Sequence, residues 1–233
     1  RITYQSQRIT TNERNMRSSL MSFVLLISLS IAYGQTTQLE WAYNISAPRN
    51  DHGSRITIDI SGNVIITGHF RDTVDLDPGP GVDSHIAEDN LRDAFVAKYD
   101  TSGGYLWGHS FDWGHGGSID DVGITTDSLG FIYITAGYSG FIDFDPGPAT
   151  NYGSASGSAF LLKLTPNGDF HDLWLWGDGT GQATPTEIHL DAQGNKYIAG
   201  RFYGSVDFDP GPVTFTISTI SANAPDDIFL LKL

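Results

Sequence analysis

The segment Asp-Xaa-Asp-Pro-Gly-Pro occurs three times in this chain, at residues 75–80, 143–148 and 207–212. The second Asp of the segment recurs after 68 and then after 64 residues. A six-residue word that returns at nearly constant spacing indicates a chain built from repeated structural units. This regularity constrains the architecture more than any other feature of the sequence.

The composition favours short strands joined by tight turns. Among 233 residues there are 27 Gly and 10 Pro, while 39% hydrophobic content is enough for a core. The 13 basic and 27 acidic residues give a formal charge of -14, which disfavours nucleic acid and anionic membrane surfaces as partners. Because the chain has no cysteine, disulfides and Cys-based zinc sites are excluded.

The N-terminal region resembles an export signal. Residues 1–15 show no periodicity, and we interpret them as an upstream extension outside the fold. Residues 16–34 combine a basic start, an apolar stretch over 21–31 and a small-residue ending, which predicts a signal peptide cleaved after Gly34. The apolar stretch is shorter than the roughly 20 residues of a spanning helix, so we expect no membrane span after cleavage. The predicted location is therefore secreted or cell-surface.

Three further sequence features recur at the same spacing as the Asp-Pro-Gly-Pro segment. A turn flanked by Asp and Gly precedes a β-branched run, and an apolar run carrying one Lys follows the Asp-Pro-Gly-Pro segment. A second Gly turn then leads to a strand bearing Trp107 or Trp174, matched by Trp41 ahead of the first unit, and we expect all three indoles to pack in the core. Each unit therefore supplies up to four strands, called a to d. The predicted strands are a at 54–60, 121–127 and 186–191; b at 63–70, 131–138 and 195–202; c at 93–99, 158–164 and 227–233; and d at 104–110 and 169–176.

Four-stranded antiparallel units repeated in sequence predict an all-β chain folded as a β-propeller. The blades are expected at about 54–110, 121–176 and 186–233 within a repeat region covering 35–233, with residues 39–45 as a ring-closing strand of type d. Three blades are fewer than the usual four to eight. We therefore expect a fragment of a larger ring, with the pairing of two three-blade chains as the alternative.

Two stretches of the sequence are informative together. Residues 93–107 read Asp-Ala-Phe-Val-Ala-Lys-Tyr-Asp-Thr-Ser-Gly-Gly-Tyr-Leu-Trp, and residues 191–200 follow the pattern Asp-Xaa-Xaa-Gly-Asn-Xaa-Tyr-Ile-Xaa-Gly. They resemble the bacterial beta-propeller repeats often called SBBP repeats, over residues 39–233. The resemblance implies a secreted or cell-surface propeller without an assigned activity. Units of about 66 residues are longer than is usual for that family, and the added length surrounds the Asp-Pro-Gly-Pro segment.

The acidic segments are candidate cation sites. On an extended chain, the two carboxylates of Asp-Xaa-Asp point to the same side, and calcium would relieve their repulsion. The candidate ligands are Asp75 with Asp77, joined by Asp83 in the first unit, Asp143 with Asp145, and Asp207 with Asp209. The competing interpretation is a rigid turn, because Pro fixes φ and Gly permits a reversal. Calcium is the one cofactor that the sequence suggests.

A Gly-rich connection between the first two units is a candidate ligand-binding loop. It carries Asp112, Trp113 and His115, and an aromatic ring beside polar groups on a loop suits sugar stacking. An ordinary connection between blades is the alternative.

Two functions from different classes follow from these features. The first is a secreted or cell-surface binding or scaffold module that contacts a polysaccharide or a protein. The alternative is a propeller-based carbohydrate-active enzyme that uses carboxylates such as Asp112, Asp120 or Asp178. No nucleophile elbow, phosphate loop or dinucleotide fingerprint is present in the sequence, so no catalytic residue is predicted.

Overall fold

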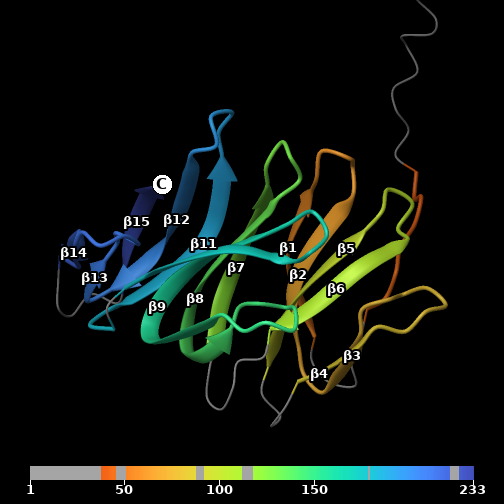
Figure 1. Ribbon diagram of the computed structural model, residues 1–233, viewed down its shortest axis with the longest axis horizontal. Helices are drawn as coiled ribbons and strands as arrows, with labels where there is room; N and C mark the ends of the chain where they lie inside the picture. Colours follow the sequence, from red (N-terminus) through yellow and green to blue (C-terminus); the bar gives the residue numbers. More distant parts are fainter. Residues whose placement is uncertain (1–37, 46–50, 88–91, 112–117, 178, 221–225) are drawn as a thin grey trace, which may run out of the picture. The chain divides into compact units, whose positions relative to one another are not determined.

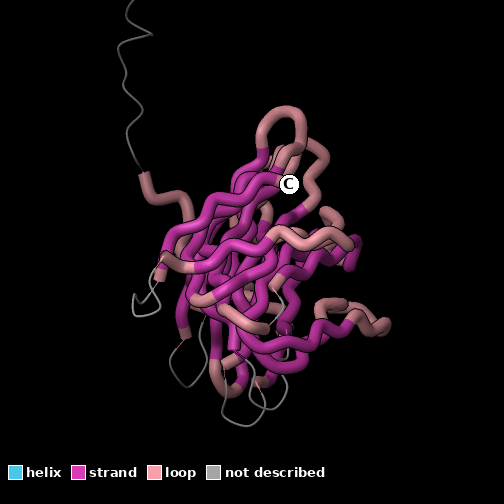
Figure 2. The backbone as a smooth tube through the Cα atoms, turned by 90° about the vertical axis from the view of Figure 1, so that its left-hand side faces the viewer, coloured by secondary structure: helices cyan, strands magenta, loops and turns pink. Residues whose placement is uncertain are grey.

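The computed structural model describes residues 38–45, 51–87, 92–111, 118–177, 179–220 and 226–233, without the side chains of 118–121 and 154–157. The chain divides into two units, Arg1–Glu40 and Trp41–Leu233. The described part of the second unit contains strands and turns but no helix (Figure 2). The predicted all-β class is confirmed.

Three antiparallel sheets follow one another along the second unit (Figure 1). We call them blades 1, 2 and 3. Blade 1 has the order β1-β2-β5-β6 and consists of β1 (His52–Ile58), β2 (Val64–Phe70), β5 (Asp93–Tyr99) and β6 (Tyr105–Phe111). Blade 2 consists in the same way of β7 (Ser118–Thr126), β8 (Ile132–Asp143), β9 (Tyr152–Leu164) and β10 (Phe170–Trp176). Blade 3 has the order β11-β12-β15 and consists of β11 (Gln182–Leu190), β12 (Lys196–Tyr203) and β15 (Asp227–Lys232).

Each blade is an up-and-down meander, so sequence neighbours are also sheet neighbours. The predicted strands of types a to d are found at these places, and the third strand of blade 1 has the predicted bounds, Asp93–Tyr99. The first strands β1 and β11 both pack beside β7. The blades therefore stack face to face around their first strands in the manner of propeller blades, and the arrangement is open rather than a closed ring.

The hydrophobic core lies between the blades. One buried cluster joins Ile65, Val96 and Phe111 of blade 1 to the facing side of blade 2. A second cluster joins the opposite side of blade 2 to blade 3. The two junctions bury the same positions of the repeat. Residues of blade 2 that face blade 1 correspond to residues of blade 3 that face blade 2. The corresponding pairs are Ile124 and Ile188, Ile134 and Ile198, Phe144 and Phe208, and Phe160 and Phe229.

The Asp-Pro-Gly-Pro segment forms the connection between the second and third strands of each blade. In blade 1 it joins β3 (Thr73–Asp75) to β4 (Ser84–Ile86), and in blade 3 it joins β13 (Ser205–Asp207) to β14 (Thr216–Ser218). In blade 2 the strands β8 and β9 are long enough to reach the turn themselves. The residue between the two Asp is buried in every blade, as Leu76, Phe144 and Phe208. This apolar side chain anchors the hairpin in the core.

The N-terminal part of the second unit differs from its predicted conformation. Residues 41–45 belong to no strand, although the sequence predicts a strand of type d over 39–45. The segment forms no hydrogen-bonded ladder with any described sheet. It lies instead against blade 1, where Trp41 and Tyr43 stack on each other with ring centroids 5.6 Å apart.

Candidate functional site

The paired carboxylates of the repeated segment accept hydrogen bonds from their own turn. In blade 2 the Oδ1 atom of Asp143 accepts from the backbone N–H groups of Asp145 at 3.1 Å and Asn151 at 2.8 Å. The Oδ1 atom of Asp145 accepts from the N–H of Gly147 at 2.8 Å. The same three bonds recur in the other blades, at Asp75 and Asp77 and at Asp207 and Asp209.

These bonds give the acidic segments a structural role. Each carboxylate closes a turn by satisfying backbone donors that would otherwise lack a partner. Within the described ranges, no group of three or more His, Asp or Glu side chains gathers where it could hold a metal ion. Asp83 lies beside Asp75, because its backbone N–H donates to Asp75 Oδ1 at 2.9 Å, while its own Oδ2 atom lies 3.0 Å from His85 Nε2. Calcium binding at these segments, the alternative to a rigid turn, is untested.

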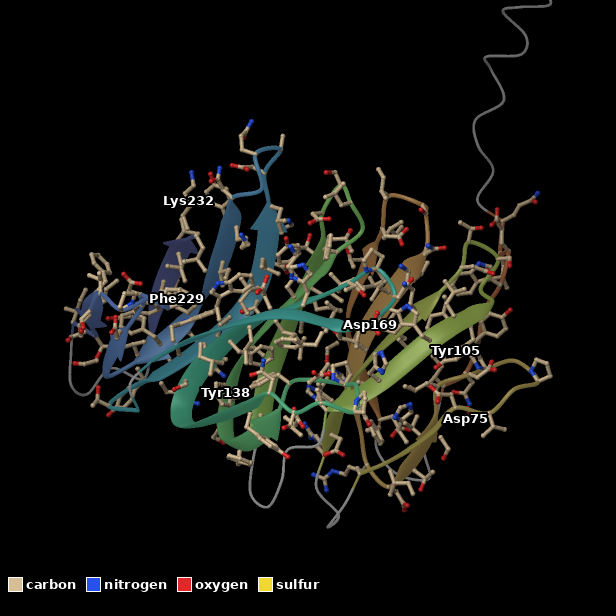
Figure 3. All side chains as sticks on the ribbon, in the orientation of Figure 1. Asp75, Tyr105, Tyr138, Asp169, Phe229 and Lys232 are labelled. Carbon is tan, nitrogen blue, oxygen red and sulfur yellow. The ribbon has the colours of Figure 1, made fainter. Side chains whose placement is uncertain are left out.

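Asp83 is part of a polar cluster that sequence reasoning missed. The Nε2 atom of His85 lies 3.0 Å from Asp83 Oδ2, its Nδ1 atom lies 2.9 Å from Ser110 Oγ, and the Tyr105 hydroxyl donates to the same carboxylate of Asp83. Tyr105 is labelled on β6 in Figure 3. Burial raises the pKa of Asp83, but hydrogen bonds from Tyr105 and His85 outweigh it and lower the pKa overall. The cluster occurs only in blade 1 among the described blades, because the positions of His85 and Ser110 are taken by Gly153 and Leu175 in blade 2.

The three residues proposed for sugar stacking, Asp112, Trp113 and His115, lie outside the described residues. Of the carboxylates named for an enzyme, Asp178 also lies outside them, and only the backbone of Asp120 is described, in β7. These predictions stay untested.

A groove between blades 1 and 2 is a candidate binding site. It has a volume of about 440 Å³ and opens at the end of the blades that carries the first and third turns. Exposed apolar side chains, Ile60 and Leu129, stand on its rim. Polar groups of Ser61, Asn63 and Asn167 also line it. Volumes of this size are typical of ligand sites.

A buried ion pair lies at the base of the groove. Lys98 Nζ is 2.9 Å from Asp59 Oδ2, and it also donates to the carbonyl of Pro166 in blade 2 at 2.9 Å. Burial raises the pKa of Asp59, but hydrogen bonds from Lys98, Asn63 and Ser61 outweigh it and lower the pKa to about 2. The Trp107 indole N–H points to the same Pro166 carbonyl at 3.4 Å. The floor is therefore fixed by contacts that cross the junction of two blades.

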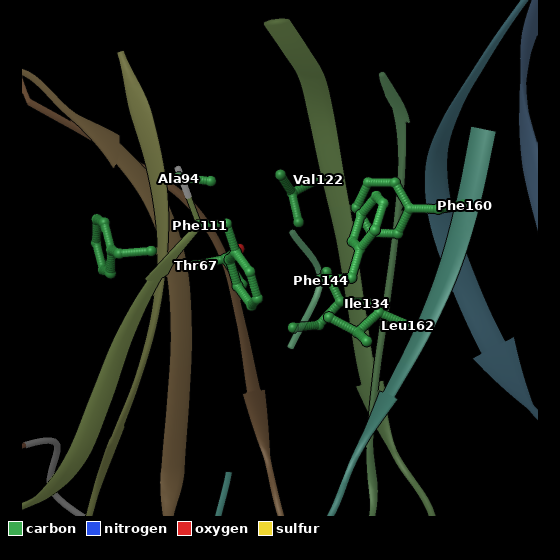
Figure 4. Close-up of a pocket in the computed structure, with 9 residues that line it drawn as sticks. Thr67, Ala94, Phe111, Val122, Ile134, Phe144, Phe160 and Leu162 are labelled. Carbon is green, nitrogen blue, oxygen red and sulfur yellow. The ribbon is translucent and has the colours of Figure 1, made fainter. Parts of the chain in front are cut away.

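A second hollow lies deeper in the same junction. It measures about 10 Å³ and is enclosed by apolar side chains that include Phe111, Phe144 and Phe160 (Figure 4). Such a space is the size of a single water molecule. It is a packing defect of the core rather than a ligand site.

The comparisons with known proteins point to a repeat propeller. The chain is 24% identical over 220 residues to an uncharacterized WD repeat-containing protein of Acanthamoeba polyphaga mimivirus, and the match covers 82% of this chain. The chain spans only 15% of the length of that relative. No family model matches, so membership of the bacterial SBBP repeats stays a prediction. The described residues also contain no helix long and apolar enough to cross a membrane.

Proposed function

We propose that this chain is a secreted or cell-surface propeller module that binds a protein partner in the groove between blades 1 and 2. The observation that carries the proposal is the contrast between exposed apolar side chains on the rim of the groove and a fixed polar floor. Exposed Ile60 and Leu129 stand on turns above a floor held by the buried pair of Lys98 and Asp59. Exposed apolar groups on a rigid scaffold are typical of interaction sites, because binding then orders few additional groups.

The rim favours a protein over a polysaccharide. Sugar rings stack on exposed aromatic faces, whereas the side chains that project from this rim are aliphatic and the one aromatic, Trp107, is partly buried in the core. Amide groups of Asn63 and Asn167 beside the aliphatic rim suit a peptide backbone. A polysaccharide partner is the alternative, and the loop with Trp113 would then be its place.

The groove is tested with charge substitutions on its rim. Ile60→Asp and Leu129→Asp are expected to reduce partner recovery at least tenfold in affinity capture from the source organism, quantified by mass spectrometry. Val82→Asp is the matched control, because Val82 is equally exposed but lies on the hairpin of blade 1 outside the groove. Loss of capture by Val82→Asp, or retention by both rim variants, would reject the groove as the binding site.

Export is tested separately. Deletion of residues 16–34 is expected to retain the protein in the cytoplasm, whereas the unaltered chain should reach the medium or the cell surface. Fractionation followed by immunoblotting distinguishes the two results. Equal distribution of the two chains would exclude a signal peptide at this place.

An enzyme is the second candidate, and the polar cluster of blade 1 is the observation that favours it. His85 can accept the Ser110 hydroxyl proton at Nδ1 while its Nε2–H is held by Asp83, which is the arrangement of an activated serine. Hydrolysis of an aryl ester or acetylated polysaccharide should then disappear in Ser110→Ala and persist in Ser102→Ala. If the chain is a binding module alone, neither the unaltered protein nor the two variants should hydrolyse these substrates.

A further inference from the structure

The hairpin that joins β8 to β9 in blade 2 (Figure 1) carries two exposed aromatic side chains, Phe141 and Tyr152. Phe141 is 55% exposed and Tyr152 is 53% exposed. Their rings stack on each other with centroids 4.4 Å apart and an interplanar angle of 21°. Blade 2 packs against blade 1 on one side and blade 3 on the other, and the pair is exposed in spite of both neighbours.

The two rings lie on one face of the hairpin. Tyr152 pairs with Asp143, which follows Phe141 by two residues, so Phe141 and Tyr152 are diagonal neighbours on the same face. Ile142 points to the opposite face and is fully buried in the cluster that joins blades 1 and 2. Phe144 is buried in the same cluster. The core therefore holds the strand from behind, and the stack faces away from that cluster.

The hairpins of the other two blades form without an aromatic pair. At the positions of Phe141 and Tyr152 these blades have hydroxyl side chains. They are Thr73 and Ser84 in blade 1, and Ser205 and Thr216 in blade 3. The strands of all three hairpins pair in the same register relative to the repeated segment. Since the hairpin does not require the two rings, and exposed apolar area is unfavourable in water, the pair points to a function specific to blade 2.

A hydrogen-bond acceptor lies beside the rings. The Oδ1 atom of Asp143 accepts the backbone N–H groups of Asp145 and Asn151, which fixes the carboxylate in the turn. Within the described residues, no group donates a hydrogen bond to its Oδ2 atom. The Oδ2 atom can therefore accept a ligand hydroxyl, and the Tyr152 hydroxyl can donate to a ligand or accept from it.

We propose that Phe141, Tyr152 and Asp143 form a binding site for a neutral polysaccharide, separate from the groove between blades 1 and 2. The apolar C–H face of a pyranose ring stacks on an exposed aromatic face, while hydroxyl groups at the edge of the sugar donate to the carboxylate. Because the rings and the carboxylate are already held in place by the hairpin, binding orders few additional groups.

Charge and hydrogen-bonding chemistry select this class of ligand. The formal charge of -14, together with the carboxylates of Asp143 and Asp145 on the hairpin, disfavours an acidic polysaccharide. A proline-rich peptide also stacks on aromatic rings, but its carbonyl groups require donors, and proline has no N–H to give to the carboxylate. Sugar hydroxyls supply the donors that Asp143 lacks.

Affinity electrophoresis of the purified protein tests the site. Native gels contain hydroxyethyl cellulose, galactomannan or arabinoxylan as neutral polysaccharides, or alginate as an acidic one. At least one neutral polysaccharide should retard the unaltered chain, and alginate should retard it less. No retardation by the three neutral polysaccharides, or equal retardation by alginate, would overturn the proposal. Binding of an oligoproline peptide without binding of a neutral polysaccharide would overturn it too.

Substitutions that copy blade 1 locate the site. Phe141→Thr and Tyr152→Ser should each weaken retardation about tenfold, because each removes a stacking ring. Both should keep the fold, since blade 1 forms the same hairpin with these residues, and thermal unfolding checks this. Tyr152→Phe keeps the ring and should retain binding. Phe215→Ala is the matched control, because Phe215 is 63% exposed on the corresponding hairpin of blade 3.

Further variants separate this site from the other candidates. Ile60→Asp in the groove and Trp113→Ala in the connecting loop should bind the polysaccharide as the unaltered chain does, so the outcome is independent of partner binding in the groove. Retention of binding by both folded hairpin variants would contradict the proposal. Equal loss of binding in Phe215→Ala, Ile60→Asp or Trp113→Ala would contradict it as well.

Discussion

The Lys of the third strand shows how one repeat position serves different neighbours. In blade 1 Lys98 is buried against the Asp59 carboxylate at 2.9 Å. In blade 2 Lys163 lies over the ring of Phe131 at 4.2 Å, and in blade 3 Lys232 lies 5.1 Å from the ring centroid of Tyr197. The ammonium is thus stabilised by a charge in one blade and by an aromatic face in the others.

Asp59→Asn should therefore destabilise the protein more than the same change in blade 2. Loss of the carboxylate leaves a buried ammonium without its counter-charge, which costs about 3 kcal/mol in the free energy of unfolding. Asp127→Asn is the control, because Asp127 caps the equivalent turn through the N–H groups of Leu129 and Phe131, while Lys163 of that blade lies over an aromatic ring. Urea unfolding at pH 7 compares the two variants, and equal losses would show that the ion pair contributes nothing.

The same carboxylate predicts a dependence on pH. The pKa of Asp59 is about 2 in the folded chain, below its ordinary value of 3.8, so ionised Asp59 stabilises the fold above about pH 4. This contribution, about 2 kcal/mol, is lost as the pH falls from about 4 to 2. Unfolding curves at pH 5 and pH 3 should show a smaller difference for Asp59→Asn than for the unaltered chain. An identical pH dependence of both proteins would argue against a depressed pKa.

The first Asp of the repeated segment is expected to act as a hydrogen-bond acceptor. Asp143→Ala removes the acceptor of two backbone N–H groups and should cost about 1 to 2 kcal/mol. Asp143→Asn keeps an acceptor oxygen and should cost less. Millimolar calcium should leave the melting temperature of both variants and of the unaltered chain unchanged. A rise with calcium in the unaltered chain that is lost in Asp143→Asn would establish a cation site instead.

At the scale of elements, the buried apolar side chain between the two Asp residues helps to hold the long hairpin to its blade. Phe144 is 1% exposed and its ring lies 4.7 Å from that of Phe160 in the junction of blades 1 and 2. Phe144→Ala should cost about 3 to 5 kcal/mol, because it enlarges the hollow already present there. Phe141→Ala is the control on the same strand, since Phe141 is exposed and stacks on Tyr152. Thermal unfolding with equal losses in the two variants would refute the anchoring role.

The strands were predictable where the hydrophobic pattern is continuous. The run Asp93–Tyr99 is buried along its whole length, and its apolar run alone identifies a strand covered on both faces. The long strands of blade 2 were missed in part, because β8 continues to Asp143 beyond a register shift between Tyr138 and Gly140. Irregular pairing and a glycine at this place hide the continuation from a pattern of alternating residues.

The tryptophans of the fourth strands pack against the core as expected, although not at the same register, while Trp41 is 36% exposed. Trp107 lies opposite Lys98, whereas Trp174 lies opposite Leu161, two residues further along the blade. A shift of two preserves the face, because side chains alternate with period two. Both indoles accordingly pack against the clusters between blades, as expected.

The groove and the polar cluster could not be predicted. Lys98 meets the carbonyl of Pro166 across 68 residues of sequence, and His85 meets Ser110 across 25. No local motif predicts either contact, because each depends on how two strands or two blades are placed. A comparison of repeats would have offered one signal, since blade 2 has Gly153 where blade 1 has His85.

At the scale of the whole molecule, the blades of the second unit meet one another through equivalent surfaces. Each junction buries the same repeat positions, and Arg55 of the first blade also donates to the carbonyl of Thr186 in the third at 3.2 Å, which links the inner strands. The outer face of blade 1 is buried as well, where Phe95, Ala97 and Tyr99 are at most 5% exposed, whereas Ile228 and Leu230 of blade 3 are exposed.

Amide hydrogen exchange of the purified protein tests whether neighbouring blades are held together by the cores between them. We expect slow exchange of β5 and β9 in the unaltered chain and faster exchange of both in Phe144→Ala, because Phe144 lies in the cluster that joins blades 1 and 2. The amides of β12, which packs in the other cluster, should change least and serve as the internal control. Fast exchange of β5 in the unaltered chain, or acceleration of β9 without β5 in the variant, would contradict a core shared by the two blades.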